Sequence, residues 1–388
     1  MNTDVVVIGA GIVGAACAQA LARAGLSVLV VDRGPIAGGT TGAGEGNLLV
    51  SDKELGPELD LALLSHHRWR ELAALPIPGA DTTLGEYAEL EEKGGLVVAS
   101  DTTTLSILDT LTGQQRAAGV DAEPVPADRL TEYEPHIAAG LAGGYLYPQD
   151  MQVQPMRAAA GLLRIARADG ARVSLGNAVT GFVRDGDRVI GVRTERDKIG
   201  CAAVVNAAGT WAGEIAALAG VTVPVAPRRG FILVTEPLPP LVRHKVYYAD
   251  YVADVASNSA ALQSSTVVEG TRSGTILIGA TRERVGFDRS WSDHAIRELA
   301  RGAVALFPFL AGVSAIRAYR GFRPFCPDHL PVIGLDPRAP GLWHACGHEG
   351  AGIGLSAVTG ALIAESITGH TSTVDPHPFR PERFEDAA

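Results

Sequence analysis

Three glycines and one carboxylate near the start of the chain have the spacing of a dinucleotide-binding site. Gly9, Gly11 and Gly14 form a Gly-x-Gly-x-x-Gly motif, and Asp32 follows it. The first glycine of such a motif permits a tight turn, the second lets a pyrophosphate approach the backbone, and the third lets a helix pack closely on a strand. A carboxylate placed like Asp32 accepts hydrogen bonds from ribose hydroxyls. These four residues predict that the chain binds a dinucleotide.

The residues around the motif predict the elements that must position it. The apolar run at residues 5–8 predicts a buried strand, the Ala- and Leu-rich residues 15–24 a helix, and residues 27–32 a second strand. Ile12 and Val13 lie in the turn where the helix begins, and its N–H groups and positive dipole favour phosphate. An ordinary strand, turn and helix would not need three glycines and an acid in register.

Residues 33–47 form a second stretch of small residues, beginning at Arg33. Small residues let the backbone come close to a ligand, and the position directly after Asp32 favours a second contact with the same cofactor. The alternative is a flexible loop that binds nothing. A simple NAD-binding fold would run on into another strand at this point, so the loop disfavours one.

Composition limits the classes of protein that remain. A length of 388 residues suits two interleaved domains with sizeable cores. The net charge of −10 argues against nucleic acid or an anionic membrane as the main partner. The four cysteines are far apart and form no Cys-x-x-Cys pair, so we expect neither a zinc site nor an iron–sulfur cluster. Without a signal peptide or a bilayer-spanning apolar run, a cytoplasmic location is expected.

The order of elements predicts an α/β protein in which a Rossmann-like domain is interleaved with an α+β domain built on a mainly antiparallel sheet. Helices are expected at residues 57–75, 104–118, 151–168 and 292–306. The nucleotide-binding domain is expected at residues 1–80, 145–222 and 320–388, and the second domain at residues 81–144 and 223–319. Residues 249–265 show no clear element and are interpreted as a lid.

Three separated motifs together resemble the FAD-dependent amine and amino-acid oxidoreductases of the D-amino-acid oxidase, glycine oxidase and sarcosine oxidase family. They are the N-terminal glycine motif, the Val-Val-Asn-Ala-Ala-Gly-Thr-Trp stretch at residues 204–211, and the glycine-rich turn into a helix at residues 347–356. Residues 278–288, 323–331 and 347–356 most resemble the flavin subunits of D-hydroxyproline dehydrogenase, opine oxidases and hydrogen cyanide synthase. The resemblance covers nearly the whole chain.

The resemblance implies non-covalent FAD, because family members with covalent FAD carry a cysteine near Gly321, whereas Cys326 is out of register. The glycine motif would hold the pyrophosphate and Asp32 the ribose, and the turn at residues 348–355 would wrap the isoalloxazine. The helix after this turn would stabilise negative charge on the reduced flavin. The expected cofactor contacts are Gly9, Gly11, Ile12, Val13, Gly14, Asp32, Arg33, Thr40, Thr41, Glu45, Gly46, Asn47, Val179, Ala208, Gly209, Trp211, Gly350, Gly352, Ile353, Gly354 and Leu355.

Two residues are candidates for the chemistry. Arg323 matches the family arginine that forms a bidentate pair with the substrate carboxylate, a geometry that lysine cannot reproduce. The alternative is a structural ion pair of Arg323 with Asp328 or Glu349. His348 is a candidate base, although flavin amine oxidation mainly needs a neutral amine and a C–H bond aimed at flavin N5. A structural or flavin-facing histidine is the other interpretation.

The resemblance implies oxidation of a carboxylate-bearing amine to an imine, with a small-molecule amino acid as the substrate. A D-amino acid, a cyclic imino acid such as D-hydroxyproline and an opine-type N-substituted amino acid all remain open, because Val267 and Gly350 stand where glycine oxidases carry residues that face the substrate. Leu277 stands near the position where sarcosine oxidases carry a lysine for oxygen activation, which disfavours a fast reaction with oxygen. A second interpretation is a flavin subunit that passes electrons to an iron–sulfur partner or a second flavin subunit. A NAD-dependent dehydrogenase is disfavoured, and a non-catalytic flavin carrier would leave Arg323 without a purpose.

Overall fold

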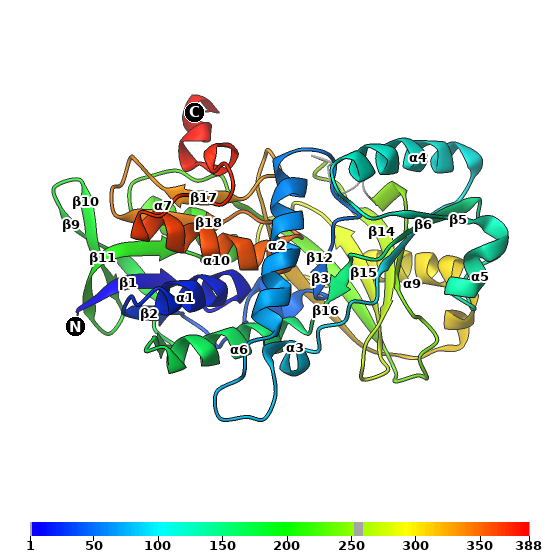
Figure 1. The fold of residues 1–388 in the computed structure, drawn as a ribbon, viewed down its shortest axis with the longest axis horizontal. Coiled ribbons are helices and arrows are strands. Elements are labelled where there is room, and N and C mark those ends of the chain that lie inside the picture. Colours follow the sequence, from blue (N-terminus) through cyan, green and yellow to red (C-terminus); the bar gives the residue numbers. More distant parts are fainter. Residues whose placement is uncertain (1, 252–258, 388) are drawn as a thin grey trace.

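The computed structural model describes residues 2–251 and 259–387. The molecule is elongated, and each of its two parts is built around an eight-stranded sheet (Figure 1). The chain crosses between the parts several times, because strands early and late in the sequence belong to the same sheet. Residues that lie far apart in the sequence therefore meet between the two parts.

The first sheet is parallel at its centre, where β1 lies between β2 and β11. The apolar residues of these central strands are buried on both faces, as expected when helices cover a parallel sheet. The helices α1 (Ile12–Arg23) and α10 (Gly352–Thr368) pack against each other on this sheet (Figure 1). In sheet order the strands are β17 (Val332–Leu335), β18 (Leu342–Cys346), β11 (Lys198–Asn206), β1 (Asn2–Ile8), β2 (Val28–Val31) and β8 (Arg172–Ser174), with β10 (Arg188–Thr194) and β9 (Val179–Asp185) paired beyond β11.

The second sheet is antiparallel except where β13 pairs with β4. The helix α9 (Asp293–Leu306) packs on β12, β14 and β15, and α4 (Thr102–Ala117) packs on β4 and β6. In sheet order the strands are β16 (Ala315–Phe325), β12 (Ala226–Thr235), β15 (Ile276–Arg282), β14 (Gln263–Gly270), β13 (Lys245–Tyr248), β4 (Gly95–Ala99), β6 (Gly143–Tyr147) and β5 (Glu123–Pro126).

Two long helices and several short elements complete the fold. α2 (Pro57–Ala73) packs on α10, and α6 (Pro155–Ala168) packs on α1. The short elements are η1 (Thr40–Ala43), β3 (Asn47–Leu48), α3 (Leu84–Tyr87), η2 (Ala127–Arg129), α5 (Leu130–Tyr133), β7 (Met151–Gln152), η3 (Gly209–Trp211), α7 (Ala212–Leu218), η4 (Pro308–Gly312), η5 (His377–Phe379) and η6 (Pro381–Ala387).

The predicted fold class, an α/β part and a second part on a mainly antiparallel sheet, is confirmed. The helix expected at residues 151–168 was placed too early, because it begins at Pro155. Met151 and Gln152 instead pair with β3, and the side chain of Gln154 caps the helix by accepting the Arg157 N–H. Proline suits the first helical position because its missing N–H is not needed there.

Two expectations stay open. The division into domains remains a proposal, and the strands β6 and β16 each run across one of the expected boundaries, at residues 144/145 and 319/320. Residues 252–258 of the lid expected at residues 249–265 lie outside the described residues, and residues 263–265 begin β14.

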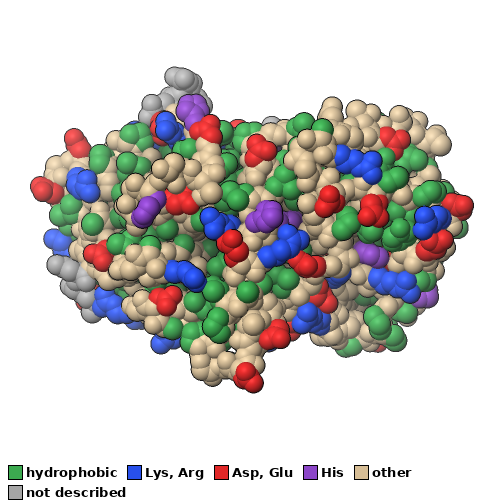
Figure 2. All heavy atoms as spheres, in the orientation of Figure 1, with side chains coloured by type: hydrophobic (Ala, Val, Ile, Leu, Met, Phe, Trp, Pro, Cys, Tyr) green, Lys and Arg blue, Asp and Glu red, His purple; other side chains and the backbone are tan. Residues whose placement is uncertain are grey.

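Charges of both signs are interspersed on the face of the molecule shown in Figure 2. This face offers no continuous basic surface to a polyanion, in keeping with the net charge of −10. Within residues 2–251 and 259–387, the chain contains no helix that is both long and apolar enough to cross a membrane.

Gly360 sets how closely the two helices at the centre of the first part approach. A Cβ atom at this position would lie 2.6 Å from the backbone oxygen of Ala16 on α1. This distance is far below van der Waals contact, and the obstacle is backbone that cannot rotate away. By contrast, Gly113 on α4 is exposed, and a Cβ there would meet nothing within 4 Å.

We expect Gly360→Ala to lower the free energy of unfolding by about 1–3 kcal/mol, because the added methyl group overpacks the α1–α10 contact. The matched substitution Gly113→Ala should be neutral or raise stability by up to about 1 kcal/mol, because alanine favours the helix over glycine. Urea denaturation of both variants measures the difference. Equal stabilities for the two would show that the helices can move apart without cost.

Candidate functional site

A cavity of about 510 Å³ is lined by residues of both parts of the molecule. In the first part, the carboxyl ends of β1, β2 and β11 border it, as do η1 and the turn before α10. In the second part, β12 and β16 border it. Ligands of open α/β sheets bind outside the carboxyl ends of the strands, so the cavity lies where such a fold places its cofactor.

Most of the predicted site residues lie around this one cavity, including both candidates for the chemistry, Arg323 and His348. Gly14, Gly354 and Leu355 do not line it. The predicted cofactor residues that do are Gly9, Gly11, Ile12, Val13, Asp32, Arg33, Thr40, Thr41, Glu45, Gly46, Asn47, Val179, Ala208, Gly209, Trp211, Gly350, Gly352 and Ile353.

The three glycines of the first motif have different surroundings. Gly9 has a φ of +117°, and a Cβ there would lie 2.3 Å from the Ala207 carbonyl oxygen. A Cβ at Gly14 would lie 2.0 Å from the Gly9 carbonyl oxygen, so this glycine serves the packing of helix on strand. A Cβ at Gly11 would meet only the Thr41 hydroxyl, at 3.1 Å. Gly11 is therefore the position where backbone lies open to a ligand.

The Asp32 carboxylate is held in place by backbone amides at the end of β2. Its two oxygens accept the N–H groups of Ala10 and Gly34, each at 2.7 Å. A carboxylate has about four lone-pair sites, so further sites remain after these two bonds. Because Asp32 also borders the cavity, these sites can accept the hydroxyls of a ribose.

Glu45 and Asn47 carry buried oxygen atoms that lack a hydrogen-bond partner among the described residues. These atoms are Glu45 Oε1 and Asn47 Oδ1, while Asn47 Nδ2 donates to Glu45 Oε2 at 3.2 Å. An unpaired buried polar atom costs about 1–3 kcal/mol, so such atoms beside a cavity indicate a missing polar ligand. The predicted flavin-side loop thus fits a polar ring system.

Arg323 extends from β16, and its Nη1 donates to the Thr281 carbonyl oxygen at 2.8 Å. The structural ion pairs considered for it are not formed, because Asp328 pairs with Arg383 at 2.7 Å and Glu349 with Arg228 at 3.4 Å. Burial, and then the neighbouring Arg282, lower the pKa of Arg323 to about 10. The side chain stays cationic at neutral pH and favours an anionic ligand.

His348 borders the cavity but is itself buried. Its Nε2 lies 3.0 Å from the Thr359 hydroxyl, which donates to the Leu355 carbonyl oxygen at 2.8 Å. Since that hydroxyl proton is engaged, we assign the proton of the imidazole to Nε2 and the lone pair to Nδ1. Burial lowers the pKa of His348 to about 3, so the ring is neutral over the ordinary pH range.

The first turn of α10 borders the cavity. Gly350, Gly352 and Ile353 line the large cavity, and among the described residues no side chain caps this helix. Gly354 and Leu355 instead border a second cavity of about 20 Å³, which is also lined by Asn47 and Gly350. The exposed amides and the positive end of the helix dipole suit a group that gains negative charge.

Several lining residues were missed from the sequence, among them Glu214, Arg289 and Phe322. Phe322 could have been found from its position beside Arg323. Arg289 carries no motif and reaches the site only through the fold.

The residues present fit an FAD molecule. The cavity combines an open glycine backbone, a fixed carboxylate, unpaired polar atoms and an uncapped helix N-terminus. These are the features that a diphosphate, a ribose and a flavin ring need.

Comparisons with known proteins agree with this geometry. The family model for FAD dependent oxidoreductases (DAO) matches residues 4–366. Hydrogen cyanide synthase subunit HcnC of Pseudomonas aeruginosa is 32% identical over 98% of this chain and 96% of its own length. Glycine oxidase of the same organism is 31% identical over 98% of this chain and 99% of its own.

A solved structure shows the same fold at full length. The crystal structure of glycine oxidase from Geobacillus kaustophilus matches with a TM-score of 0.87 and 27% identity, covering 98% of this chain and 99% of that one. The chain therefore belongs to the DAO family of FAD dependent oxidoreductases and is an enzyme of that class.

Proposed function

We propose that the enzyme oxidises an amine that carries a carboxylate. The proposal rests on one observation: the guanidinium of Arg323 lines the cofactor cavity and has no carboxylate partner among the described residues. Bound FAD supplies a hydride acceptor at N5. The substrate would lose a hydride from Cα to this acceptor and a proton from nitrogen to water, so that its C–N bond becomes C=N. Water would then hydrolyse the imine to a 2-oxo acid with release of ammonia or an amine, whereas a cyclic substrate would remain a cyclic imine.

Arg323 acts by binding and orienting the substrate. Its planar guanidinium matches a carboxylate with two parallel hydrogen bonds, and this pairing fixes the direction of the Cα–H bond. The bond from Nη1 to the Thr281 oxygen holds the guanidinium in one orientation before the substrate arrives. A carboxylate also offsets the repulsion from Arg282 that lowers the pKa of Arg323.

His348 is assigned a structural, flavin-facing role in preference to that of a base. A general base works best with a pKa near the operating pH, whereas burial lowers the pKa of His348 to about 3. The amine substrate must therefore lose its proton elsewhere, for instance to water before it binds.

FAD is proposed to bind without a covalent link. Among the cysteines, Cys346 borders the cavity, and burial raises the pKa of its thiol to about 12. Cys326 is buried and does not line the cavity. A thiol that remains protonated is a poor nucleophile, so neither side chain is prepared to bond the flavin.

A second candidate function is that of one subunit in a larger dehydrogenase. HcnC, a relative along nearly the whole chain, is named as a subunit of hydrogen cyanide synthase. The electrons would then pass to a partner that holds an iron–sulfur cluster or a second flavin. Within the described residues no group of three His, Cys, Asp or Glu side chains could hold a metal. Co-purification with a small cysteine-rich chain would favour this function over a stand-alone oxidase.

The proposal predicts which compounds reduce the flavin. In the absence of oxygen, one of D-proline, D-hydroxyproline, D-alanine, glycine, sarcosine or octopine should bleach the visible flavin bands of the purified enzyme. Pyrrolidine, which is D-proline without its carboxylate, is the control and should leave the bands unchanged. If the enzyme holds FAD and pyrrolidine bleaches it as fast as D-proline does, the carboxylate is not recognised. Admitting air then tests whether oxygen is the acceptor.

Changing Arg323 should weaken substrate binding without loss of FAD. Arg323→Leu removes a charge-assisted bidentate pair and should raise KM about 100-fold or more, and Arg323→Lys about tenfold because the charge remains. Arg317→Lys, an exposed position on the same strand, is the control and should behave as wild type. Steady-state kinetics and the FAD absorbance of each variant are the measurements. An unchanged KM in Arg323→Leu would remove this residue from the substrate site.

The buried His348 predicts a stability that depends on pH. Its pKa is lowered in the folded state, so only the unfolded chain binds the proton as pH falls below about 6.5, and stability is lost from there towards pH 3. When the pH falls from about 7 to about 5, this proton uptake lowers the free energy of unfolding by about 2 kcal/mol in wild type. It makes no contribution in His348→Gln, which lacks the titrating ring. Urea denaturation at both pH values gives the difference. Equal losses in the two proteins would mean that His348 titrates normally.

A further inference from the structure

The segment that joins β15 to α9, residues 283–291, leaves the second sheet and reaches the cofactor cavity of the first part. Phe287 stacks on Trp211 with ring centroids 5.4 Å apart and planes inclined by 5°. It also meets the ring of Phe322 edge-on at 5.4 Å. Two residues further along, Arg289 lines the cavity itself. The segment thus touches the cofactor site at two points.

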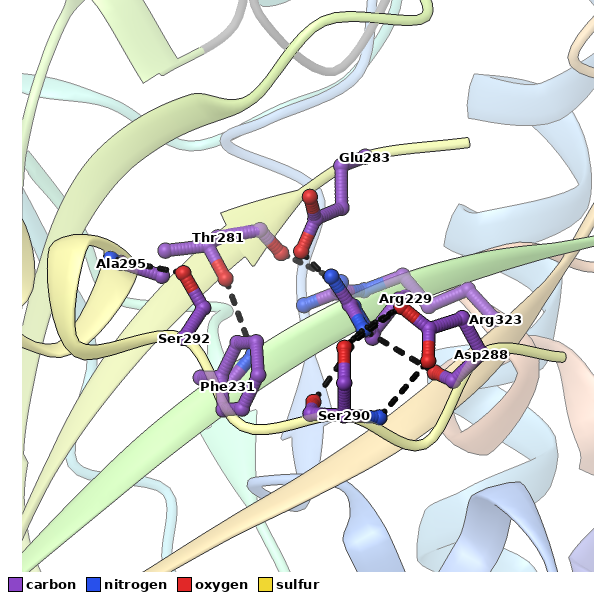
Figure 3. A network of polar contacts seen from close by, with 9 residues as sticks. All are labelled: Arg229, Phe231, Thr281, Glu283, Asp288, Ser290, Ser292, Ala295 and Arg323. Atoms are coloured by element: carbon purple, nitrogen blue, oxygen red, sulfur yellow. Dashed lines mark hydrogen bonds and ion pairs between the residues drawn. The ribbon is translucent and has the colours of Figure 1, made fainter. Parts of the chain in front are cut away.

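Arg229 on β12 holds this segment in place (Figure 3). Its side chain is buried, and its Nε donates to Glu283 Oε1 at 2.8 Å. Its Nη1 donates to Asp288 Oδ2 at 2.8 Å and to the Ser290 carbonyl oxygen at 3.2 Å. One guanidinium therefore fixes the segment at its start and again on both sides of Arg289.

The aromatic residues Trp211 and Phe287 contact further side chains that line the cavity. Arg33 lies over the Trp211 ring at 4.2 Å, and both side chains line the cavity. Phe322, on the other side of Phe287, precedes Arg323 and also lines the cavity. Phe287 is consequently the link between the nucleotide side of the site and the strand that carries Arg323.

The charge of Arg289 suits the cofactor. Three arginines among the described residues line the cavity, of which Arg323 donates to Thr281 and Arg33 lies over Trp211. Arg289 is the third, and it comes from the second part of the molecule. The permanent charge of FAD is its diphosphate, and arginine pairs with phosphate through a bidentate fork.

We propose that residues 283–291 form a latch that retains FAD. Phe287 packs the segment against Trp211, and Arg289 contributes a cation for the diphosphate. The bond between Arg229 and Asp288 keeps the segment in this position. The inference rests on the non-covalent binding of FAD proposed above, since a covalently attached flavin needs no latch.

The test measures the rate at which FAD leaves the holoenzyme, followed by the rise in flavin fluorescence after dilution. Phe287→Ala should speed release about tenfold, because it removes a stacked aromatic pair. Arg289→Ala should speed it about tenfold at low salt and less at high salt, where charges are screened. Asp288→Asn should speed it about threefold, although Asp288 does not line the cavity, because it loosens the bond to Arg229.

Two matched variants control for general effects. Val285→Ala changes a side chain of the same segment that is as exposed as Phe287, each at 38%, and Arg297→Ala removes an exposed charge on α9. Neither residue lines the cavity, so both variants should release FAD at the wild-type rate. The contacts of Phe287 and Asp288 are also made without FAD, so the apoproteins of these two variants should unfold at slightly lower temperatures than wild type, by amounts that do not follow their rates of FAD release.

The outcomes separate the latch from the proposed function. If the variants at 287, 288 and 289 hold FAD and release it at the wild-type rate, the latch is overturned while the oxidation of amines stands. If their apoproteins unfold earlier in proportion to the faster release, the segment supports the fold alone and the latch is again overturned. A wild-type protein that binds no FAD would overturn both proposals.

Discussion

The carbonyl oxygen of Phe322 is the point on which the geometry of the site depends. It accepts the hydroxyl protons of Thr40 at 2.6 Å and Thr210 at 2.7 Å, so η1 and η3 of the first part both hold β16 of the second. Each bond adds only about 0.5–1.5 kcal/mol. Their structural effect is larger, because Arg323 is the next residue along the strand. The position of the guanidinium relative to the cofactor cavity is set by two threonines that belong to the nucleotide side.

Strand β15 contacts both Glu45 and Arg323, which form no ion pair with each other among the described residues. A Cβ at Gly279 would lie 1.7 Å from Glu45 Oε1, so the absence of a side chain there makes room for the Glu45 carboxylate. Two residues later, the Thr281 carbonyl oxygen accepts the bond from Arg323. The arginine is thus oriented by a neutral acceptor, and its charge is left for a ligand. An ion pair with Glu45 would have cancelled that charge, at the desolvation cost that buried pairs carry.

The sequence predicts those features that depend on residues close together in the chain, and it does not predict those that depend on distant residues. The glycine motif and Asp32 act through turns and amides within a few residues, so their spacing alone indicates the site, and even Gly14, which lies outside the cavity, packs helix on strand as the motif requires. The start of α6 was missed because Met151 and Gln152 pair with β3, a contact made by distant residues. The residues Phe287 and Arg289 were missed for the same reason. Phe287 belongs to residues 278–288, which carry a family resemblance but indicate no contact, and Arg289 follows them without a motif. Only the path of the chain after β15 brings Phe287 to Trp211 and Arg289 to the cavity.

The same distinction explains why the cofactor is easier to assign than the substrate. The groups expected to hold FAD are largely backbone at the carboxyl ends of the first sheet, and such contacts tolerate many side-chain changes as long as the turns persist. The proposed substrate anchor, Arg323, is a side chain of β16 in the second sheet. Arg282 on β15, whose guanidinium lies 4.6 Å from the Tyr251 ring, is one of its charged neighbours. Relatives about 30% identical along their full lengths carry different names, glycine oxidase and hydrogen cyanide synthase subunit. With Arg323 as the proposed carboxylate anchor, selection among amines falls to the side chains around it.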